Sequence, residues 1–103
     1  MRPIPPKLRE QIAKDPFMKD CIYPGCAGKP EWEHAFTYKQ QINEAWAIVP
    51  VCAYHHRGAG LDKDYNRYRA IIRADIDDLC VRMPKKDWRQ IYKYLTQKYE
   101  NKD

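Results

Sequence analysis

The segment from residue 21 to residue 57 decides the fold, and it reads CIYPGCAGKPEWEHAFTYKQQINEAWAIVPVCAYHHR. It begins with a Cys-x4-Cys pair and ends with a Cys-x2-His-His sequence. Zinc takes four tetrahedral ligands from Cys and His, usually from two close pairs. Such an ion would tie a loop to the start of a helix and supplement the small core of a short chain. The predicted ligands of a structural zinc ion are Cys21, Cys26, Cys52 and His55.

Other interpretations of these residues have to be weighed. His56 could replace His55, because Cys-x3-His spacing also suits zinc. A disulfide pair would need an export signal, which the first residues do not resemble. Unrelated buried thiols would make the clustering of Cys and His a coincidence. Cys80 is left over; its neighbours Leu79 and Val81 indicate a buried inert thiol rather than a fifth ligand.

A second group of functional side chains lies between the Cys pairs. Glu33 and His34 are adjacent near the end of a predicted strand, and His56 follows on a predicted helix. Carboxylate oxygen and imidazole nitrogen suit Mg²⁺, Mn²⁺ or a transition ion. Histidine, with an unperturbed pKa of about 6.5, can accept a proton near neutrality. The alternative interpretation is a solvated Glu33 beside a half-buried structural His34.

Turn residues and apolar spacing divide the rest of the chain into short elements. Pro, Gly and Asp punctuate it, which predicts an α+β chain with two short strands between helices. Pro50 confines its strand to an edge or irregular position. The predicted helices are 7–14, a short one from 52 to 57, one from Asp62 or Asp64 to about 73, one from Asp75 through 81, and one from Asp87 onward. The predicted strands are 31–36 and 46–52.

Length and composition set the class of protein. The chain has 103 residues, which is enough for a single domain. We expect an N-terminal helical arm (1–20), a zinc-clasped core (21–60) and C-terminal helices (61–103). With 44% hydrophobic and 32% charged residues, the chain is too apolar for full disorder. No apolar run approaches the roughly 20 residues of a membrane span. A cytoplasmic protein with reduced thiols is therefore expected.

Taken together, these motifs resemble the HNH family of ββα-metal nucleases, in particular members whose motif is clasped by a structural zinc. The resemblance rests on the Cys21/Cys26 knuckle, on Glu33-His34, and on AIVPVCAYHH from Ala47. The last stretch is similar to the family's Asn-Leu-Val-Pro-Leu-Cys-x-x-Cys-His segment. The matched part covers just over a third of the chain, and the whole has the look of small bacteriophage-encoded members. A phage protein would act in the host cytoplasm.

The resemblance implies a metal-dependent DNA endonuclease or nickase. His34 would be the general base that activates water, and Glu33 and His56 would hold the catalytic ion, Mg²⁺ or Mn²⁺. Cys21, Cys26, Cys52 and His55 would hold the zinc. The implied reaction is hydrolysis of a DNA phosphodiester that leaves 5′-phosphate and 3′-hydroxyl ends.

The sequence departs from the family pattern at three positions. Glu33 stands where Asp is usual and is one methylene longer. His55 stands where a second Cys is usual. Ala47 stands at the position of the middle Asn, which normally braces the loop that carries the catalytic His. Asn43, four residues earlier, could substitute if the loop folds back.

The charge distribution suggests a polyanion partner. The net charge is +5, and the excess lies on both sides of a neutral centre. Cations near the motif could contact DNA phosphates without reading bases; these are Lys39, Arg57, Lys63, Arg67, Arg69 and Arg73. The alternative is a solvated helix face, whose charge Asp62 and Asp64 partly cancel. A module that binds nucleic acid or a protein without cutting, and an oligomer built on Tyr- and Trp-rich helices, are the competing functions.

Overall fold

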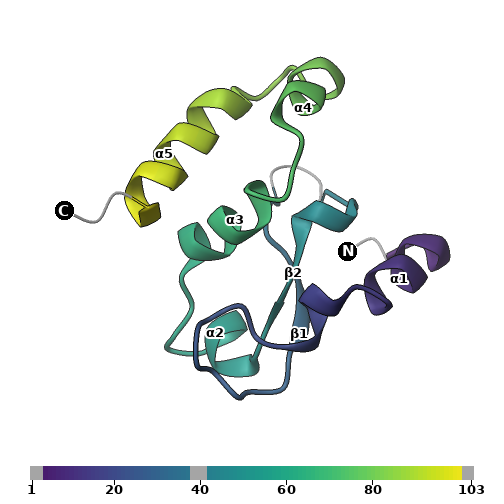
Figure 1. The fold of residues 1–103 in the computed structure, drawn as a ribbon, viewed down its shortest axis with the longest axis vertical. Helices are drawn as coiled ribbons and strands as arrows, with labels where there is room; N and C mark the ends of the chain where they lie inside the picture. The colour runs from purple at the N-terminus through teal and green to yellow at the C-terminus, as the bar shows by residue number, and fades with distance from the viewer. Residues whose placement is uncertain (1–3, 38–41, 101–103) are drawn as a thin grey trace.

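The computed structural model describes residues 4–37 and 42–100. A two-stranded antiparallel sheet and several short helices form a small α+β fold, as predicted (Figure 1). The helices are α1 (Pro6–Ala13), α2 (Ala53–Arg57), α3 (Lys63–Ile71), α4 (Ile76–Arg82) and α5 (Trp88–Glu100). The strands are β1 (Glu31–His34) and β2 (Ile48–Val51), and two 3-10 turns are η1 (Pro16–Lys19) and η2 (Ala45–Ala47).

The hairpin pairs β1 with β2 in a register that sets which side chains share a face. Glu31 lies opposite Val51 and Glu33 opposite Val49, while Trp32 and His34 lie opposite Pro50 and Ile48. Successive side chains of a strand point to opposite faces. The two glutamates therefore belong to one face of the sheet and His34 to the other.

Pro50 occupies an edge of this sheet, one of the two positions that the sequence allowed. Its carbonyl accepts a hydrogen bond from the backbone N–H of Ile22, 2.9 Å away, on the side of β2 that faces away from β1. A proline without an N–H fits there because no ladder bond is lost. Both strands are shorter than expected, and β2 starts only at Ile48 because residues 45–47 form a 3-10 turn before it. One ladder bond, from Ala35 N–H to the Ala47 carbonyl (2.9 Å), continues past β1.

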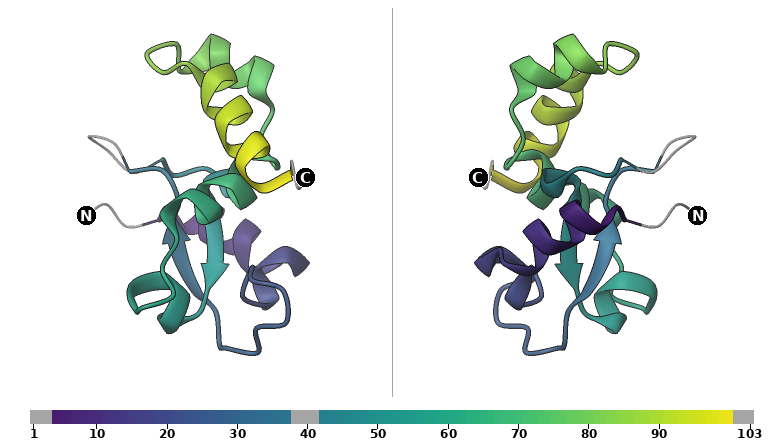
Figure 2. Two further views of the ribbon diagram at one scale, coloured as in Figure 1. Left: turned by 90° about the vertical axis from the view of Figure 1, so that its left-hand side faces the viewer. Right: turned by 90° about the vertical axis from the view of Figure 1, so that its right-hand side faces the viewer.

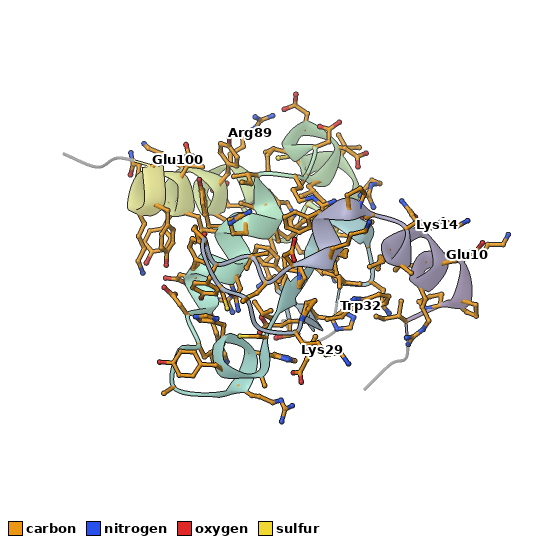
Figure 3. All side chains as sticks on the ribbon, turned by 60° about the horizontal axis from the view of Figure 1, so that its bottom comes forward. Glu10, Lys14, Lys29, Trp32, Arg89 and Glu100 are labelled. Carbon is orange, nitrogen blue, oxygen red and sulfur yellow. The ribbon has the colours of Figure 1, made fainter. Side chains whose placement is uncertain are left out.

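The two faces of the hairpin are covered by different parts of the chain. Figure 2 shows α1 on one side of the strands and α2 with α3 on the other. Trp32 and Ile48 pack with Ile12 of α1, and Figure 3 shows Trp32 on this side. Val49 and Val51 pack with residues of α3, α4 and α5 in the larger core, which includes the fully buried Trp88 and Leu95.

Aspartate residues start the helices that follow the hairpin. Asp62 accepts the backbone N–H of Tyr65 at the start of α3, which selects Asp62 over Asp64 as the cap. Asp75 caps α4 in the same way, and Asp87 accepts the Gln90 N–H at the start of α5. Each cap satisfies a backbone donor that a helix start leaves unpaired. Helix α3 ends at Ile71, two residues before the expected position.

Arg69 of α3 and Arg73, just beyond its end, fix the N-terminal arm to the rest of the chain. The Arg73 guanidinium donates to Asp15 (2.5 Å) and lies 3.9 Å from the centre of the Phe17 ring. Asp15 also accepts the N–H of Phe17, which caps η1. Arg69 donates to the Ile22 carbonyl (2.5 Å). These bonds hold the arm beside the turn that carries the first Cys pair.

Candidate metal centre and the adjoining carboxylate–histidine group

Four side chains from the two ends of the motif meet beside the sheet. The ligand atoms of Cys21, Cys26, Cys52 and His55 all lie within 4.8 Å of one another. Within the part of the chain that the structure describes, no other group of three or more Cys, His, Asp or Glu side chains converges in this way. We call these four residues the Cys3His cluster. The cluster can hold a metal ion such as zinc, as the sequence predicted.

The spacing inside the Cys3His cluster matches tetrahedral zinc. Bonds of about 2.3 Å to sulfur and about 2.0–2.1 Å to nitrogen separate two sulfurs by about 3.8 Å, and a sulfur from a nitrogen by about 3.6 Å. The Sγ atoms of Cys26 and Cys52 are 3.8 Å apart. Nδ1 of His55 lies 3.5, 3.7 and 3.2 Å from the sulfurs of Cys21, Cys26 and Cys52. A disulfide needs about 2.05 Å, and all three thiols are free.

Glycines allow the Cys21–Cys26 turn to approach the second pair. Gly25 adopts a φ of 75°, a left-handed conformation that other residues rarely take. A Cβ on Gly28 would lie 2.5 Å from Cβ of Cys52, so a larger residue would push the two halves of the cluster apart. The Gly28 N–H also points at Sγ of Cys26, 3.5 Å away.

The first turn of α2 sets which histidine joins the cluster. Cys52 is the residue before the helix, and the backbone N–H of His55 holds the pKa of its thiol down at about 7. A thiol with a lowered pKa is more readily available as the thiolate that zinc binds. His55 projects back over Cys52, whereas the next residue, His56, contacts Glu31 instead. The structure therefore selects His55 over His56 as the fourth member.

Cys80 lies outside the cluster. It is half-buried on α4 and packs against the core beside the fully buried Leu79. This placement agrees with the interpretation of Cys80 as a thiol without a ligand role.

Glu33 is held by a residue of α3. Its Oε2 accepts a hydrogen bond of 2.5 Å from Nδ2 of Asn66. Burial raises the pKa of the Glu33 carboxyl, and the charges of His56, Lys63 and Arg67 act against that rise. The charge of His56 therefore acts on Glu33, but no hydrogen bond or ion pair joins the two side chains among the described residues.

His56 is held by a residue of β1. Its Nδ1 lies 2.8 Å from Oε1 of Glu31, and Arg57 binds the same carboxylate through Nε (3.2 Å) and Nη2 (2.7 Å). Hydrogen bonds from Arg57 and His56 lower the pKa of Glu31 to about 2. A carboxylate on one ring nitrogen fixes the tautomer and leaves Nε2 as the possible metal ligand.

His34 is held by the loop that follows β1. Its Nε2 lies 2.6 Å from Oδ1 of Asn43, so the amide oxygen accepts the ring N–H. This contact is the substitute brace suggested for Asn43, while Ala47 is fully buried in η2. The proton on Nε2 leaves Nδ1 as the basic atom. No side-chain hydrogen bond joins His34 to Glu33 or His56 among the described residues. This agrees with the place of His34 on the other face of the sheet.

The predicted phosphate-binding cations have different surroundings. Lys63 is exposed, whereas Arg67 donates to the Ala35 carbonyl (3.2 Å) and pairs with Asp64 (3.7 Å). The guanidinium groups of Arg69 and Arg73 are engaged in the internal contacts described above, and Arg57 is paired with Glu31. Lys39 lies outside the described residues. Lys63 and Arg67 are the described members of the set whose charges act on Glu33.

Sequence analysis did not identify three residues that build this region. Glu31 could have been found from the Glu-x-Glu alternation, which puts it on the same face as Glu33. Tyr23 stacks on His55 with ring centres 3.8 Å apart and planes 11° apart. Asn66 lies on α3, ten residues beyond His56 in sequence, and no local pattern marks it.

The comparisons with other proteins give no relative from which to transfer a role. Searches against protein-family models, curated proteins and solved structures found no match. No helix among the described residues is long and apolar enough to span a membrane.

Proposed function

We propose that this chain is a metal-dependent DNA nuclease of the HNH type, with zinc in the Cys3His cluster as a structural ion. One observation carries the proposal. Glu33, His34 and His56 each have one polar atom held by a protein partner, and each keeps a second atom free of hydrogen bonds within the described part of the chain. The free atoms are Oε1 of Glu33, Nδ1 of His34 and Nε2 of His56. We call these three residues the carboxylate–histidine group.

The partners suit the roles that the resemblance gives these residues. Metal-bound histidines usually donate their second ring N–H to a carboxylate, as His56 does to Glu31 in this tautomer. Metal-bound carboxylates are themselves hydrogen-bonded, as Glu33 is by Asn66. When bound, a divalent ion such as Mg²⁺ or Mn²⁺ would stabilise the developing charge on the phosphate and on the leaving oxygen.

The opposite orientation of Glu33 and His34 fits an in-line displacement. The attacking water and the leaving oxygen lie on opposite sides of the phosphorus in such a reaction. Adjacent residues of a strand point to opposite faces, so a phosphate at the end of β1 could meet His34 from one side and Glu33 from the other. His34 would accept the proton of the water on Nδ1 while Asn43 holds Nε2–H.

Cations beside Glu33 would position the DNA backbone. Lys63 and Arg67 already act on the charge of Glu33, so a phosphate near that carboxylate would lie within their field. Contacts of this kind carry no base information, and we expect weak sequence preference. A reducing cytoplasm, that of the host for a phage-encoded protein, would keep the three cluster thiols free for zinc.

A plasmid assay tests the proposal. Zinc-loaded protein is incubated with supercoiled plasmid and Mg²⁺ or Mn²⁺, and nicked circles are counted. We expect nicking by the wild type and a loss of at least about 100-fold in Glu33→Gln, which keeps the shape of the side chain but not its charge. Glu10→Gln is the matched control, because Glu10 projects from the outer side of α1 far from the sheet (Figure 3).

A binding module that does not cut is the second candidate. The observation in its favour is that Glu31 is shared between His56 and Arg57, an arrangement that also stabilises a purely structural contact between α2 and β1. This function predicts salt-sensitive DNA binding, or binding of a protein partner, that Glu33→Gln leaves unchanged. Nicking in no divalent ion, together with such binding, would favour it.

A further inference from the structure

Asn66 is the one fully buried polar side chain among the described residues, with 1% of its surface exposed. A buried amide costs free energy unless its donors and acceptors are paired. Both ends of this amide form hydrogen bonds. The two partners, Tyr23 and Glu33, lie outside α3. An apolar residue would fill the same space without needing hydrogen-bond partners. Packing alone therefore does not account for an asparagine at this position.

The orientation of the amide follows from its partners. A carboxylate only accepts hydrogen bonds, so the NH2 group faces Glu33, with Nδ2 2.5 Å from Oε2. The amide oxygen then faces Tyr23, whose hydroxyl donates to it over 3.3 Å. The Glu33 carboxylate thus sets the orientation of the amide, and the Tyr23 hydroxyl satisfies the oxygen at its other end.

Tyr23 in turn contacts the Cys3His cluster. Its ring stacks on the imidazole of His55, and it belongs to the turn between Cys21 and Cys26. A continuous series of contacts therefore runs from His55 to Tyr23, to Asn66 and to Glu33. Four segments that are distant in sequence take part in it.

We propose that Asn66 is a positioning residue that holds the Glu33 carboxylate for the divalent ion, and that Tyr23 makes this position depend on the Cys3His cluster. The inference rests on the proposed function. Because the amide occupies Oε2, Oε1 is the oxygen that would be available to hold the ion. The glutamate side chain is one methylene longer than the aspartate usual in the family, and the hydrogen bond restricts its additional rotation.

The hydrogen bond also distinguishes positioning from simple burial. If Asn66 only filled the core, its replacement would lower thermal stability and leave the affinity for the ion unchanged. If Asn66 positions Glu33, its replacement leaves the Glu33 carboxylate free to rotate, and the affinity for the ion falls. Partners of metal ligands typically contribute about 10–100-fold to metal affinity.

The test measures Mn²⁺ binding to the zinc-loaded protein by calorimetry, without DNA. Asn66→Ala is expected to weaken binding about 10–100-fold. Tyr23→Phe removes only the hydroxyl and is expected to weaken it about 3–10-fold, as for one lost hydrogen bond. Tyr65→Phe is the matched control, because its hydroxyl contacts the Ile22 carbonyl and Arg69 rather than Asn66, and no change is expected.

A further variant tests the link to the cluster. His55→Cys keeps four zinc ligands but removes the ring on which Tyr23 stacks. We expect it to retain zinc and to weaken Mn²⁺ binding to about the same extent as Tyr23→Phe. Unchanged Mn²⁺ affinity with zinc retained would overturn the proposed link.

The outcomes separate this inference from the proposed function. If the wild type binds no Mn²⁺, or binds it equally well as Glu33→Gln, the proposed function fails. If Glu33→Gln abolishes binding while Asn66→Ala and Tyr23→Phe both match the wild type, only the positioning role fails. Should Asn66→Ala not fold, as judged by circular dichroism, Tyr23→Phe decides the question alone.

Discussion

The Cys3His cluster and the carboxylate–histidine group lie side by side but are built differently. In the cluster, four donor atoms face one another within 4.8 Å and need only an ion between them. In the carboxylate–histidine group, each side chain faces a different partner: Asn43, Glu31 or Asn66. The first arrangement would enclose an ion completely, whereas the second is held from outside and keeps atoms without a hydrogen bond among the described residues.

This difference indicates what each region can do. A closed set of four protein ligands suits a structural ion, because no position is left for water or substrate. An open set supported by outer partners suits a site that must admit a phosphate and release it. The turn with Gly25 and Gly28 serves the first region, and residues spread over β1, the following loop and α3 serve the second.

Removal of zinc should have the largest effect. The cluster joins the Cys21–Cys26 turn to α2, and binding of a structural zinc is worth about 10–16 kcal/mol in small zinc domains. We expect a chelator, or Cys52→Ser, to abolish the cooperative thermal transition followed by circular dichroism. Cys80→Ser is the matched control and should keep both zinc and the transition. Removal of Mg²⁺ or Mn²⁺ should leave the fold intact. Unfolding on their removal would contradict the assignment of the structural role to the Cys3His cluster.

The next largest effect is expected from the replacement of Asn43, and it concerns catalysis. In Asn43→Ala, His34 loses the acceptor that orients its ring and fixes the proton on Nε2. Nicking should fall about 10–100-fold while zinc content and melting temperature stay unchanged. Asn43→Asp keeps an acceptor oxygen and should restore most of the activity. Equal nicking by Asn43→Ala and the wild type would show that this contact does not support a base.

Gly28→Ala should damage the closed region selectively. The added Cβ would overlap Cβ of Cys52 at 2.5 Å, so the cluster must widen. We expect a loss of about 2 kcal/mol in unfolding free energy and weaker zinc binding in a competition assay. Gly25→Ala, whose cost of about 1 kcal/mol comes from the left-handed φ alone, is the comparison. If Gly28→Ala binds zinc as tightly as the wild type, the close approach is not required.

The smallest effect concerns the N-terminal arm. Asp15→Asn keeps an oxygen for the η1 cap but loses the charge that faces Arg73. The loss should be about 0.5–1 kcal/mol, or a few degrees in melting temperature. The Phe17 N–H and Arg73 lower the pKa of Asp15, so its contribution is complete above the ordinary carboxyl value and lost only as pH falls below it. The difference from the wild type should therefore be the same at pH 7 and pH 5.

The Cys3His cluster was predictable from sequence because its members are marked by residue type and spacing. Cysteine is rare, and two pairs with zinc spacing leave few alternatives, so the cluster is as predicted and only the choice between His55 and His56 needed the structure. The α+β class and the Asp caps were also predictable, because each depends on residues within a few positions of one another.

The residues that hold the carboxylate–histidine group were not predictable in the same way. Glu31, Asn43 and Asn66 are common polar residues, and what matters is the side chain they meet after the chain has folded. The role of Asn66 depends on α3 crossing over β1, which brings residues 33 and 66 together. Strand alternation could have shown that Glu33 and His34 leave the strand on opposite faces, but not which partner each one finds.

The most direct test of the account is the fate of nicked plasmid treated with DNA ligase, for wild type and His34→Ala at equal zinc content. Ligase reseals only breaks with 5′-phosphate and 3′-hydroxyl ends, which hydrolysis at the open region should leave. We predict Mn²⁺-dependent nicks that ligase reseals in the wild type, and at least about 100-fold fewer in His34→Ala. No nicking by fully zinc-loaded wild type in Mg²⁺ or Mn²⁺, or equal nicking by both proteins, would contradict the account.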